Sequence, residues 1–406
     1  MEFDNYSRAE VLEKLFALWK PGKQTELVPL EESLNRISAE PLVSRFTLPL
    51  VRSSGGDGIA VRSADFEAAL PGLPDTAHWK PGKDYVRADT GDDFDDAFDT
   101  VIMIEEVTFN ETGGLSLTKG ITVTPGMNVN GRGSAIEEGE LILEAALPIR
   151  SPDLGALARG GLWDVPVVKK PVAAFIPTGN ELIPLRREPQ RGQNIDTNSI
   201  MARHMLLEMG AEPLILPIIR DDPGLLKAGL LAALKTADVV IINGGSSKGA
   251  DDYNARLLAE LGECICHGVL AAPGRPLCLG VVDNKPVVNL PGPIIAAYFG
   301  MDWCIRAILC RALGIPVPVR PRVKAVLTGN TGRTLPEGFE FFYRMEVTKT
   351  ASGYDAWPVP FDRVPGKRTQ GFHSGQCVMK GPHSPSPGDE IEVELCYPSI
   401  TTAPGG

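Results

Sequence analysis

Residues 237–253 read ADVVIINGGSSKGADDY, an apolar run that changes abruptly to glycines, serines and acids. A run apolar at every position is typical of a strand covered on both faces. Further runs of this kind, each ending in turn residues, lie at 171–179, 212–222 and 285–292. Helical patterns separate them at 198–209, 224–235 and 252–262. Alternating strands and helices predict a doubly wound α/β domain with a parallel sheet over residues 169–315.

The residues that follow the apolar runs form the candidate site, because ligands of such sheets bind beyond the carboxyl ends of the strands. They lie at 178–182, 221–223, 244–253 and 291–293. The glycines and serines at 244–247 offer open backbone N–H groups and hydroxyls ahead of a helix, which favours a phosphate. Nearby carboxylates would repel that phosphate unless a divalent cation bridged them. Each loop alone fits an ordinary turn or helix cap; together they predict a magnesium-assisted phosphoester site.

Other features of the sequence exclude several function classes. The loop at 244–253 has neither the Walker A nor the GxGxxG pattern, so ATP hydrolysis and NAD binding are disfavoured. A net charge of −11, from 40 Lys+Arg and 51 Asp+Glu, disfavours a non-specific nucleic-acid binder. No apolar run reaches the roughly 18 residues of a membrane helix, and the N-terminus lacks a signal-peptide pattern. We expect a cytoplasmic protein without a nucleic-acid or membrane partner.

Cysteines and aspartates give weaker signals. Seven cysteines are an odd number, scattered over residues 264–396, which does not suggest a disulfide framework. The segment Cys264-Ile265-Cys266-His267 lacks a second pair of metal ligands and alternates like a strand. Seven aspartates lie within 84–99; we expect a solvated face there, with an acidic loop near a cation as the alternative.

The rest of the chain divides by patterning into three further regions. Residues 6–19 and 27–37 have helical spacing, and with 137–168 they predict an N-terminal helical/linker domain made of 1–47 and 137–168. Between these parts, short alternating runs with many turns predict a small β-rich module over 48–136. Beyond a proline-rich linker, 316–406 is expected to form a C-terminal β domain.

Short motifs occur in a fixed order along nearly the whole chain: DGIAVR at 57–62, TG at 90–91, TGNEL at 178–182, DTN at 196–198, RDD at 220–222, GG at 244–245, PGRP at 273–276 and LPG at 290–292. In content and order they resemble the molybdopterin molybdenumtransferase family, the metal-inserting enzymes of molybdenum cofactor synthesis, which include the E domain of gephyrin. That family writes DGYAVR, TGDEL, PGKP and LPGNP at the corresponding places.

The resemblance implies a homodimer whose α/β domain binds molybdopterin. The active site would lie between that domain of one subunit and the β-rich module of the other. Such enzymes take adenylylated molybdopterin and molybdate, hydrolyse the adenylate with Mg²⁺ present, and leave molybdenum on the dithiolene.

The resemblance also implies roles for single residues. The acids on the metal and molybdate side would be Glu181, Asp222 and Asp252. The partner subunit's module would contribute Asp57 and Thr90. The phosphate cradle would be Gly245, Ser246 and Ser247, and Arg275 would supply a cation for phosphate or molybdate. Further substrate-binding positions would be Thr178, Gly179, Asn198, Gly244, Pro291 and Gly292.

Several residues depart from the family pattern at the expected site. Asn180 replaces an acid, Ser134 and Ala135 stand where the family has two acids, Ala272 replaces a basic residue, and Pro293 replaces Asn. Two hypotheses follow. The chain is a divergent insertase, with molybdate or tungstate as its oxyanion, or it is a non-catalytic molybdopterin-binding paralogue that acts as carrier, regulator or scaffold.

Overall fold

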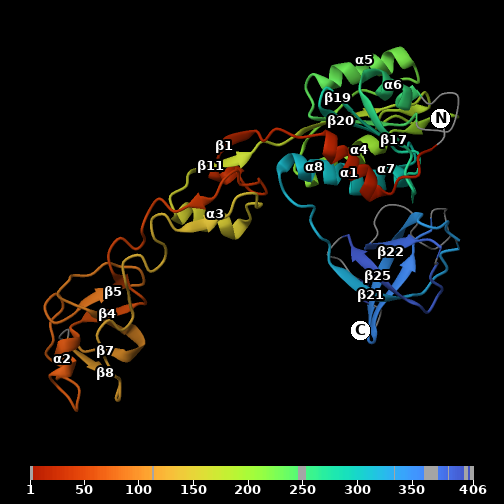
Figure 1. Ribbon diagram of the computed structural model, residues 1–406. Helices are drawn as coiled ribbons and strands as arrows, with labels where there is room; N and C mark the ends of the chain where they lie inside the picture. The colour runs from red at the N-terminus through yellow and green to blue at the C-terminus, as the bar shows by residue number, and fades with distance from the viewer. Residues whose placement is uncertain are drawn as a thin grey trace. The chain divides into compact units, whose positions relative to one another are not determined.

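The computed structural model describes residues 3–111, 114–245, 253–332, 334–360, 374–382, 384–396 and 401–402. The chain divides into two compact units (Figure 1). The larger unit is Met1–Gln24 with Lys169–Gly406, and the smaller unit is Thr25–Val168. No helix in the described ranges is long and apolar enough to span a membrane.

A six-stranded sheet forms the centre of the larger unit. Its strands, in spatial order, are β15 (Glu212–Ile215), β12 (Val172–Pro177), β16 (Val239–Asn243), β20 (Lys285–Leu290), β19 (Cys278–Val282) and β17 (Glu263–His267). The first four strands pair in parallel, as predicted, whereas β19 and β17 add an antiparallel edge. The cysteine-containing segment 264–267 lies in β17 and is a strand, as expected.

Helices cover both faces of this sheet, which confirms the doubly wound α/β prediction. On one face lie α1 (Arg8–Leu18), α4 (Asn198–Glu208), α7 (Ile294–Gly300) and α8 (Arg306–Leu313). On the other lie α5 (Pro223–Leu234) and α6 (Tyr253–Leu261) (Figure 1). Successive residues of β12 alternate between the two cores: Ala173 and Phe175 in the first, Ala174 and Ile176 in the second. All four are fully buried, because the strand has no solvent face.

The N-terminal region corrects two expectations. The predicted first helix is present as α1, but Val11 and Leu15 are buried in the core of the larger unit, so this helix does not belong with 137–168. The predicted helix at 27–37 is wrong: these residues form β1 (Thr25–Pro29) and a short 3₁₀ turn, Leu30–Glu32. Pairing with β11 (Asp164–Val168) satisfies the backbone of β1 and overrides the helical spacing of its leucines.

The rest of the smaller unit contains the nine-residue helix α3 (Ser151–Arg159) and a β-rich module. The β-rich module was predicted from the sequence. The strands of the module are β3 (Ser53–Ser54), β4 (Gly58–Val61), β5 (Val86–Ala88), β6 (Thr100–Met103), β7 (Val107–Phe109), β8 (Leu115–Leu117) and β9 (Val129–Asn130), with a one-turn helix, α2 (Ser63–Glu67). A separate pair, β2 (Leu42–Val43) and β10 (Leu141–Leu143), joins the two ends of the chain that flank the module.

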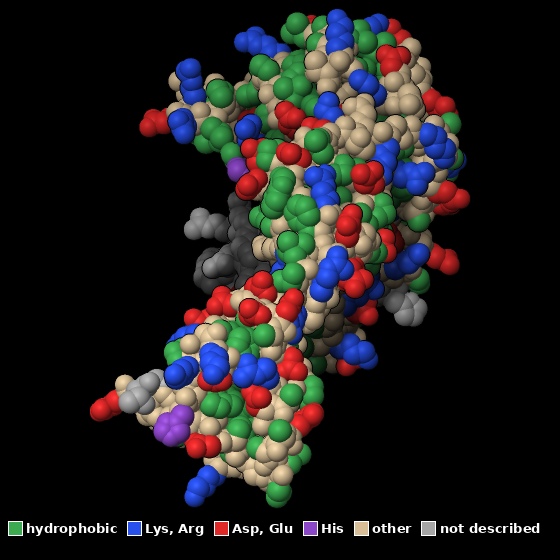
Figure 2. Space-filling view, turned by 90° about the vertical axis from the view of Figure 1, so that its left-hand side faces the viewer, with side chains coloured by type: hydrophobic (Ala, Val, Ile, Leu, Met, Phe, Trp, Pro, Cys, Tyr) green, Lys and Arg blue, Asp and Glu red, His purple; other side chains and the backbone are tan. Residues whose placement is uncertain are grey.

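The aspartate-rich segment 84–99 lies on the surface of this module. Phe94 and Phe98 are buried while Asp92, Asp95 and Asp96 are exposed. Acidic and basic side chains are interspersed over the face of the molecule in Figure 2. The segment is therefore a solvated face anchored by its two aromatic rings.

The C-terminal region folds into a closed β sheet, consistent with the predicted C-terminal β domain. Its strands are β21 (Arg322–Leu327), β22 (Glu340–Thr350), β23 (Gly353–Pro358), β24 (Gly375–Lys380) and β25 (Glu390–Leu395), with β26 (Thr401–Thr402) beside β22. Pairing of β22 with both β23 and β24 closes the sheet on itself. A two-residue strand from the α/β domain, β18 (Ala271–Ala272), pairs in parallel with the start of β22.

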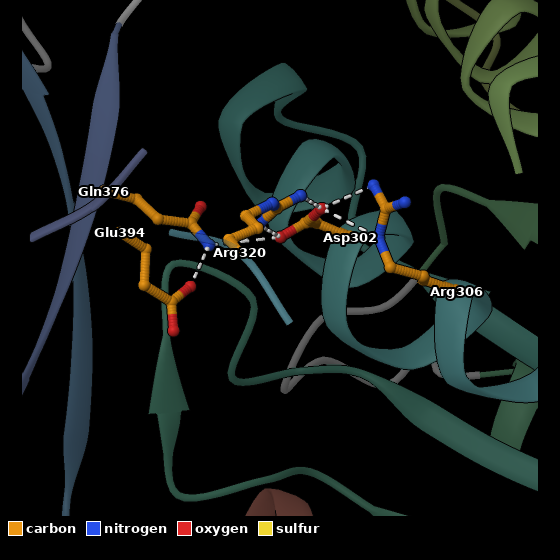
Figure 3. A network of polar contacts seen from close by, with 5 residues as sticks. All are labelled: Asp302, Arg306, Arg320, Gln376 and Glu394. Atoms are coloured by element: carbon orange, nitrogen blue, oxygen red, sulfur yellow. Dashed lines mark hydrogen bonds and ion pairs between the residues drawn. The ribbon is translucent and has the colours of Figure 1, made fainter. Parts of the chain in front are cut away.

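A buried ionic network joins this β domain to the α/β domain (Figure 3). Asp302, only 5% exposed, accepts hydrogen bonds from Arg306 and from Arg320 in the linker, at 2.9 and 2.7 Å. Gln376 on β24 donates through Nε2 to Asp302 and to Glu394 on β25, both at 3.2 Å. Burial alone would raise the pKa of Asp302, but the hydrogen bonds and charges of the two arginines outweigh it and lower that pKa.

We expect Asp302→Ala to destabilise the protein by about 3–5 kcal/mol, because it leaves two guanidinium groups without their buried counter-charge. Urea unfolding at neutral pH measures this loss of unfolding free energy. The control is the exposed pair Lys324–Glu390, where Lys324→Ala should change the unfolding free energy little.

Because the pKa of Asp302 is lowered on folding, its stabilisation is present above the unfolded pKa and is lost as the pH falls through the folded pKa. The difference in unfolding free energy between wild type and Asp302→Ala should therefore shrink in acid. A difference that stayed constant with pH would contradict the lowered pKa of Asp302.

Candidate functional site

Loops at the carboxyl ends of the parallel strands line one cleft of about 1530 Å³ in the larger unit. The cleft brings together these predicted site residues: Thr178, Gly179, Glu181, Asn198, Asp222, Gly244, Gly245, Pro291 and Gly292. Parallel pairing of β12, β16 and β20 explains the convergence, because it directs the ends of all three strands to the same edge.

Glycines let the backbone form the floor of the cleft. Gly244 has φ +116°, and a Cβ there would lie 2.5 Å from the carbonyl oxygen of Thr178. Gly245 has φ +64°, and its Cβ would lie 2.9 Å from Nδ2 of Asn254. A side chain at either position would meet both backbone strain and a collision. Gly244 therefore lets the end of β16 lie close to the residue that follows β12, and Gly245 lets it lie close to Asn254 of α6.

Buried asparagine side chains hold these loops together. Of these only Asn198 was expected at the site, from the family resemblance, whereas Asn243, Asn254 and Asn289 were not predicted from the sequence. Asn198 donates through Nδ2 to Oδ1 of Asn243 (2.8 Å) and to the carbonyl oxygen of Gly292 (2.7 Å). Asn254 and Asn289 both donate to the carbonyl oxygen of Gly244, at 2.9 and 2.8 Å. The available signal was an amide within an otherwise apolar strand, as in VVIIN and VVNL, since a polar side chain at such a position needs a specific partner.

Carboxylates line the other side of the cleft. Glu181, Asp221 and Asp222 are all exposed there. Asp222 is also the N-cap of α5, where its Oδ1 accepts the backbone N–H of Leu225 at 2.8 Å. Asn180 and Asp221 hold their two loops together reciprocally: each side-chain oxygen accepts the other's backbone N–H, at 3.2 and 3.3 Å. Asn180 can therefore replace the family's acid without loss of the loop contact.

The oxygen donors of this wall fit Mg²⁺. The described part of the chain contains no group of three His, Cys, Asp or Glu placed to hold a metal. However, Mg²⁺ is commonly held by one or two carboxylates together with substrate phosphates. Glu181 and Asp222 can supply such carboxylates beside the glycine floor. The third predicted ligand, Asp252, lies outside the described residues, as do Ser246 and Ser247 of the predicted phosphate cradle.

Arg275 does not line the cleft, although Pro273, Gly274 and Pro276 on either side of it do. Its guanidinium carbon lies 5.8 Å from the ring centroid of Phe3 and 5.6 Å from that of Phe339. The two aromatic rings give the guanidinium a face on which to pack. That Arg275 supplies a cation for phosphate or molybdate stays a prediction.

Asp57 and Thr90 lie together in the smaller unit, on adjacent loops of the β-rich module. Oδ1 of Asp57 accepts hydrogen bonds from the backbone N–H and the hydroxyl of Thr90, at 2.8 and 2.7 Å. The backbone hydrogen bond, followed by that of the hydroxyl, lowers the pKa of Asp57. Asp57 is exposed, so the module presents a carboxylate that stays ionised below its ordinary range.

Comparison with known proteins fits this arrangement. The family model "MoeA N-terminal region (domain I and II)" matches residues 6–161, and "Probable molybdopterin binding domain" matches residues 174–311. A Bacillus subtilis molybdopterin molybdenumtransferase is 28% identical over 400 residues, covering 91% of this chain and 92% of that protein. The chain belongs to the molybdopterin molybdenumtransferase family. Its members are transferases of molybdenum cofactor biosynthesis.

Two further relatives agree with the assignment to the molybdopterin molybdenumtransferase family. The enzyme of this name from Haemophilus influenzae is 29% identical over 300 residues, covering 72% of this chain and 74% of that protein. A crystal structure of a molybdopterin biosynthesis MoeA protein from Pyrococcus horikosii has a TM-score of 0.77 and 28% identity, and the match covers 97% of this chain and 99% of that one. The family match confirms the resemblance found in the sequence motifs.

The other departures from the family pattern lie at three separate places. Ser134 and Ala135 are exposed in a turn of the smaller unit, with Glu137 two residues further on. Ala272 lies in β18 and pairs with Phe341 of the C-terminal sheet. Pro293 is the N-cap of α7 and makes no side-chain capping hydrogen bond. Only Pro293 of these lines the described cleft.

Gly244→Ala tests the glycine floor. We expect a loss of about 1–3 kcal/mol of stability, because alanine at φ +116° is strained and its Cβ collides with Thr178. The matched control is Gly292→Ala on the neighbouring loop, where the nearest atom to an added Cβ is 4.0 Å away. Thermal and urea unfolding of both variants measure the difference; equal stability of the two would show that Gly244 is not conformationally required.

Proposed function

We propose that the chain transfers molybdenum to molybdopterin in this cleft. The substrates are adenylylated molybdopterin and molybdate, with tungstate as the alternative oxyanion. The bond between AMP and the molybdopterin phosphate is hydrolysed, AMP leaves, and molybdenum stays on the dithiolene. The observation that supports this most directly is the convergence of a glycine floor and the exposed carboxylates of Glu181, Asp221 and Asp222 on one edge of the sheet.

The glycine floor suits the phosphates of the substrate. Gly244 and Gly245 bring backbone rather than side chains to the cleft surface, and such a surface lets a phosphate approach closely. The charged side chains of the described cleft are otherwise mostly acidic, with Arg220 as the basic exception. A polyanionic substrate would be repelled by Glu181, Asp221 and Asp222 alone. A divalent cation between substrate and acids removes that repulsion.

In this proposal Glu181 and Asp222 hold Mg²⁺, together with Asp252 in the segment that follows Gly245. When bound, the cation neutralises charge on the phosphate whose bond is broken. Asp222 is fixed for this role because it also caps α5. Thr178, Gly179, Asn198, Pro291 and Gly292 complete the proposed binding surface, and Ser246 and Ser247 complete the phosphate cradle.

The complete site requires a second chain. We propose that Asp57 and Thr90 act on the cleft of the partner subunit in a homodimer, with the Asp57 carboxylate held ionised by Thr90. The smaller unit carries exposed apolar side chains that support a protein interface. Val43 and Leu141 are paired across β2 and β10, and the rings of Phe46 and Trp163 lie 6.5 Å apart. All four side chains are more than 40% exposed.

A non-catalytic, molybdopterin-binding role remains the second candidate, favoured by the substitutions at the site. Asn180 replaces a carboxylate of the family pattern in the cleft wall. Ser134 and Ala135 replace two further acids of that pattern. Loss of acids affects a metal-dependent hydrolysis more than it affects phosphate binding. This candidate predicts tight binding of molybdopterin without release of AMP, and the assay below distinguishes the two.

The proposed reaction is tested by AMP release from adenylylated molybdopterin, with molybdate and tungstate in separate reactions. We expect oxyanion-dependent release that stops when Mg²⁺ is chelated. Glu181→Gln should reduce the rate about 100-fold or more, because it removes one charge and keeps the shape. Glu208→Gln, an exposed residue of α4 outside the cleft, is the control and should be neutral. No release from wild type despite tight molybdopterin binding would support the non-catalytic candidate.

The shared site is tested by mixing two inactive chains. Asp57→Asn and Glu181→Gln should each be inactive alone. When the two are co-expressed, mixed dimers contain one site with both wild-type residues, so we expect part of the AMP-releasing activity to return. The control is each variant co-expressed with itself. Failure of the mixture to regain activity, in dimers shown to be mixed by mass spectrometry, would place Asp57 outside the partner's site.

A further inference from the structure

Two thiols lie almost in contact across the antiparallel edge of the central sheet. Sγ of Cys264 on β17 and Sγ of Cys278 on β19 are 3.8 Å apart, although the residues are 14 positions apart in sequence. Both side chains pack on the face of the sheet that α5 and α6 cover. Cys278 is 1% exposed, whereas Cys264 is partly exposed at the margin of this core. A reagent from solvent therefore meets Cys264 first.

The pairing of the two strands explains why the thiols meet. Cys264 lies opposite Gly280 on β19, and the register shifts between Cys264 and Cys266. An irregularity of this kind bends a strand and increases its local twist. Gly280 has no side chain, and the next residue of β19 on the same face is Cys278. The side chain of Cys264 can therefore lean along β19 until its sulfur reaches that of Cys278.

The same irregularity separates Cys266 from this pair. In a regular strand, residues two positions apart share a face. Here Cys264 packs on the α5 and α6 side of the sheet, whereas Cys266 is buried in the core on the opposite side. The sheet itself thus lies between Cys266 and Cys278. Although Cys266 is close to Cys264 in sequence, we expect it to take no part in the chemistry of the pair.

Burial makes the five other cysteines poor targets for an oxidant. Desolvation raises the pKa of Cys266, Cys377 and Cys396 to about 12 in each case. It also raises the pKa of Cys304 and of Cys310. The thiolate is the form of cysteine that reacts with oxidants, and these five side chains carry very little of it near neutral pH. Selective reaction at the Cys264–Cys278 pair follows.

We infer that Cys264 and Cys278 form an oxidation site, at which a peroxide converts the two thiols into a disulfide across the strands. The sulfur of Cys264 attacks hydrogen peroxide, the O–O bond breaks, and a sulfenic acid and one water result. The sulfur of Cys278 then displaces the sulfenic hydroxyl, which leaves as a second water with the thiol proton. The two thiols lose two electrons and two protons, and the peroxide is reduced to water. A dithiol reductant reverses the reaction.

The disulfide would close a loop that includes one wall of the cleft. Strands β17 and β19 flank residues 268–277, of which Pro273, Gly274 and Pro276 line the cleft. A bond between the strands restricts the unfolded chain more than the folded one, because the two sulfurs are already neighbours in the folded protein. The oxidised protein should therefore unfold at a higher temperature than the reduced protein.

The test treats the folded, full-length chain with hydrogen peroxide, blocks the remaining thiols with N-ethylmaleimide and maps disulfides by mass spectrometry after chymotryptic digestion. We expect the peptides that contain residues 264 and 278 to be joined, and to separate in dithiothreitol. Cys264→Ala and Cys278→Ala should each abolish the link. Cys266→Ala is the matched control and should keep it, which assigns the bond to Cys264 rather than to its neighbour.

Thermal unfolding of the same samples gives a second measurement. Oxidation should raise the Tm of wild type and of Cys266→Ala by roughly 5 °C, and it should leave the Tm of Cys264→Ala unchanged. A pair that stays unmodified, a sulfinic acid on Cys264 without a link, or a disulfide that uses another cysteine or a second chain would each overturn the inference. No step uses molybdopterin or AMP release, so the result is independent of the proposed function.

Discussion

Parallel pairing of β12 with β16, and of β16 with β20, brings three loops to one edge of the sheet, and the cleft exists because of it. The pairing is possible because both faces of these strands are covered by helices, which leaves Ala174 and Phe175 equally buried. Near the ends of β16 and β20, asparagine side chains follow the apolar residues of the strands. Asn243 and Asn289 use side-chain hydrogen bonds to hold the Gly244 and Pro291 loops where the sheet ladder ends.

The C-terminal sheet contributes to the cleft without lining it. The Asp302 network joins it to the α/β domain through the linker residue Arg320 (Figure 3), and the β18–β22 pair joins it to the turn that carries Arg275. The first contact is ionic and buried, so it resists separation of the two domains. The second is a backbone ladder beside the cleft wall.

The sequence predicted the parts of this fold that depend on local pattern. Buried strands such as 239–243 and the loops after them were found because apolar runs and glycines are visible in a single chain. The sequence did not reveal features that depend on contacts with residues far away along the chain. The leucines near 27–37 have helical spacing, but pairing with β11 makes a strand of the first part. The packing of Arg275 on Phe3 was likewise not visible in PGRP, because Phe3 lies far away in sequence.

The most direct measurement is the ratio of molybdenum bound to molybdopterin to AMP released, in a single turnover by the purified protein with adenylylated molybdopterin, molybdate and Mg²⁺. An insertase that couples hydrolysis to metal transfer should give equal amounts of the two products, both absent in Glu181→Gln. AMP release without bound molybdenum would contradict transfer in this cleft, and neither product from wild type that binds molybdopterin tightly would contradict catalysis altogether.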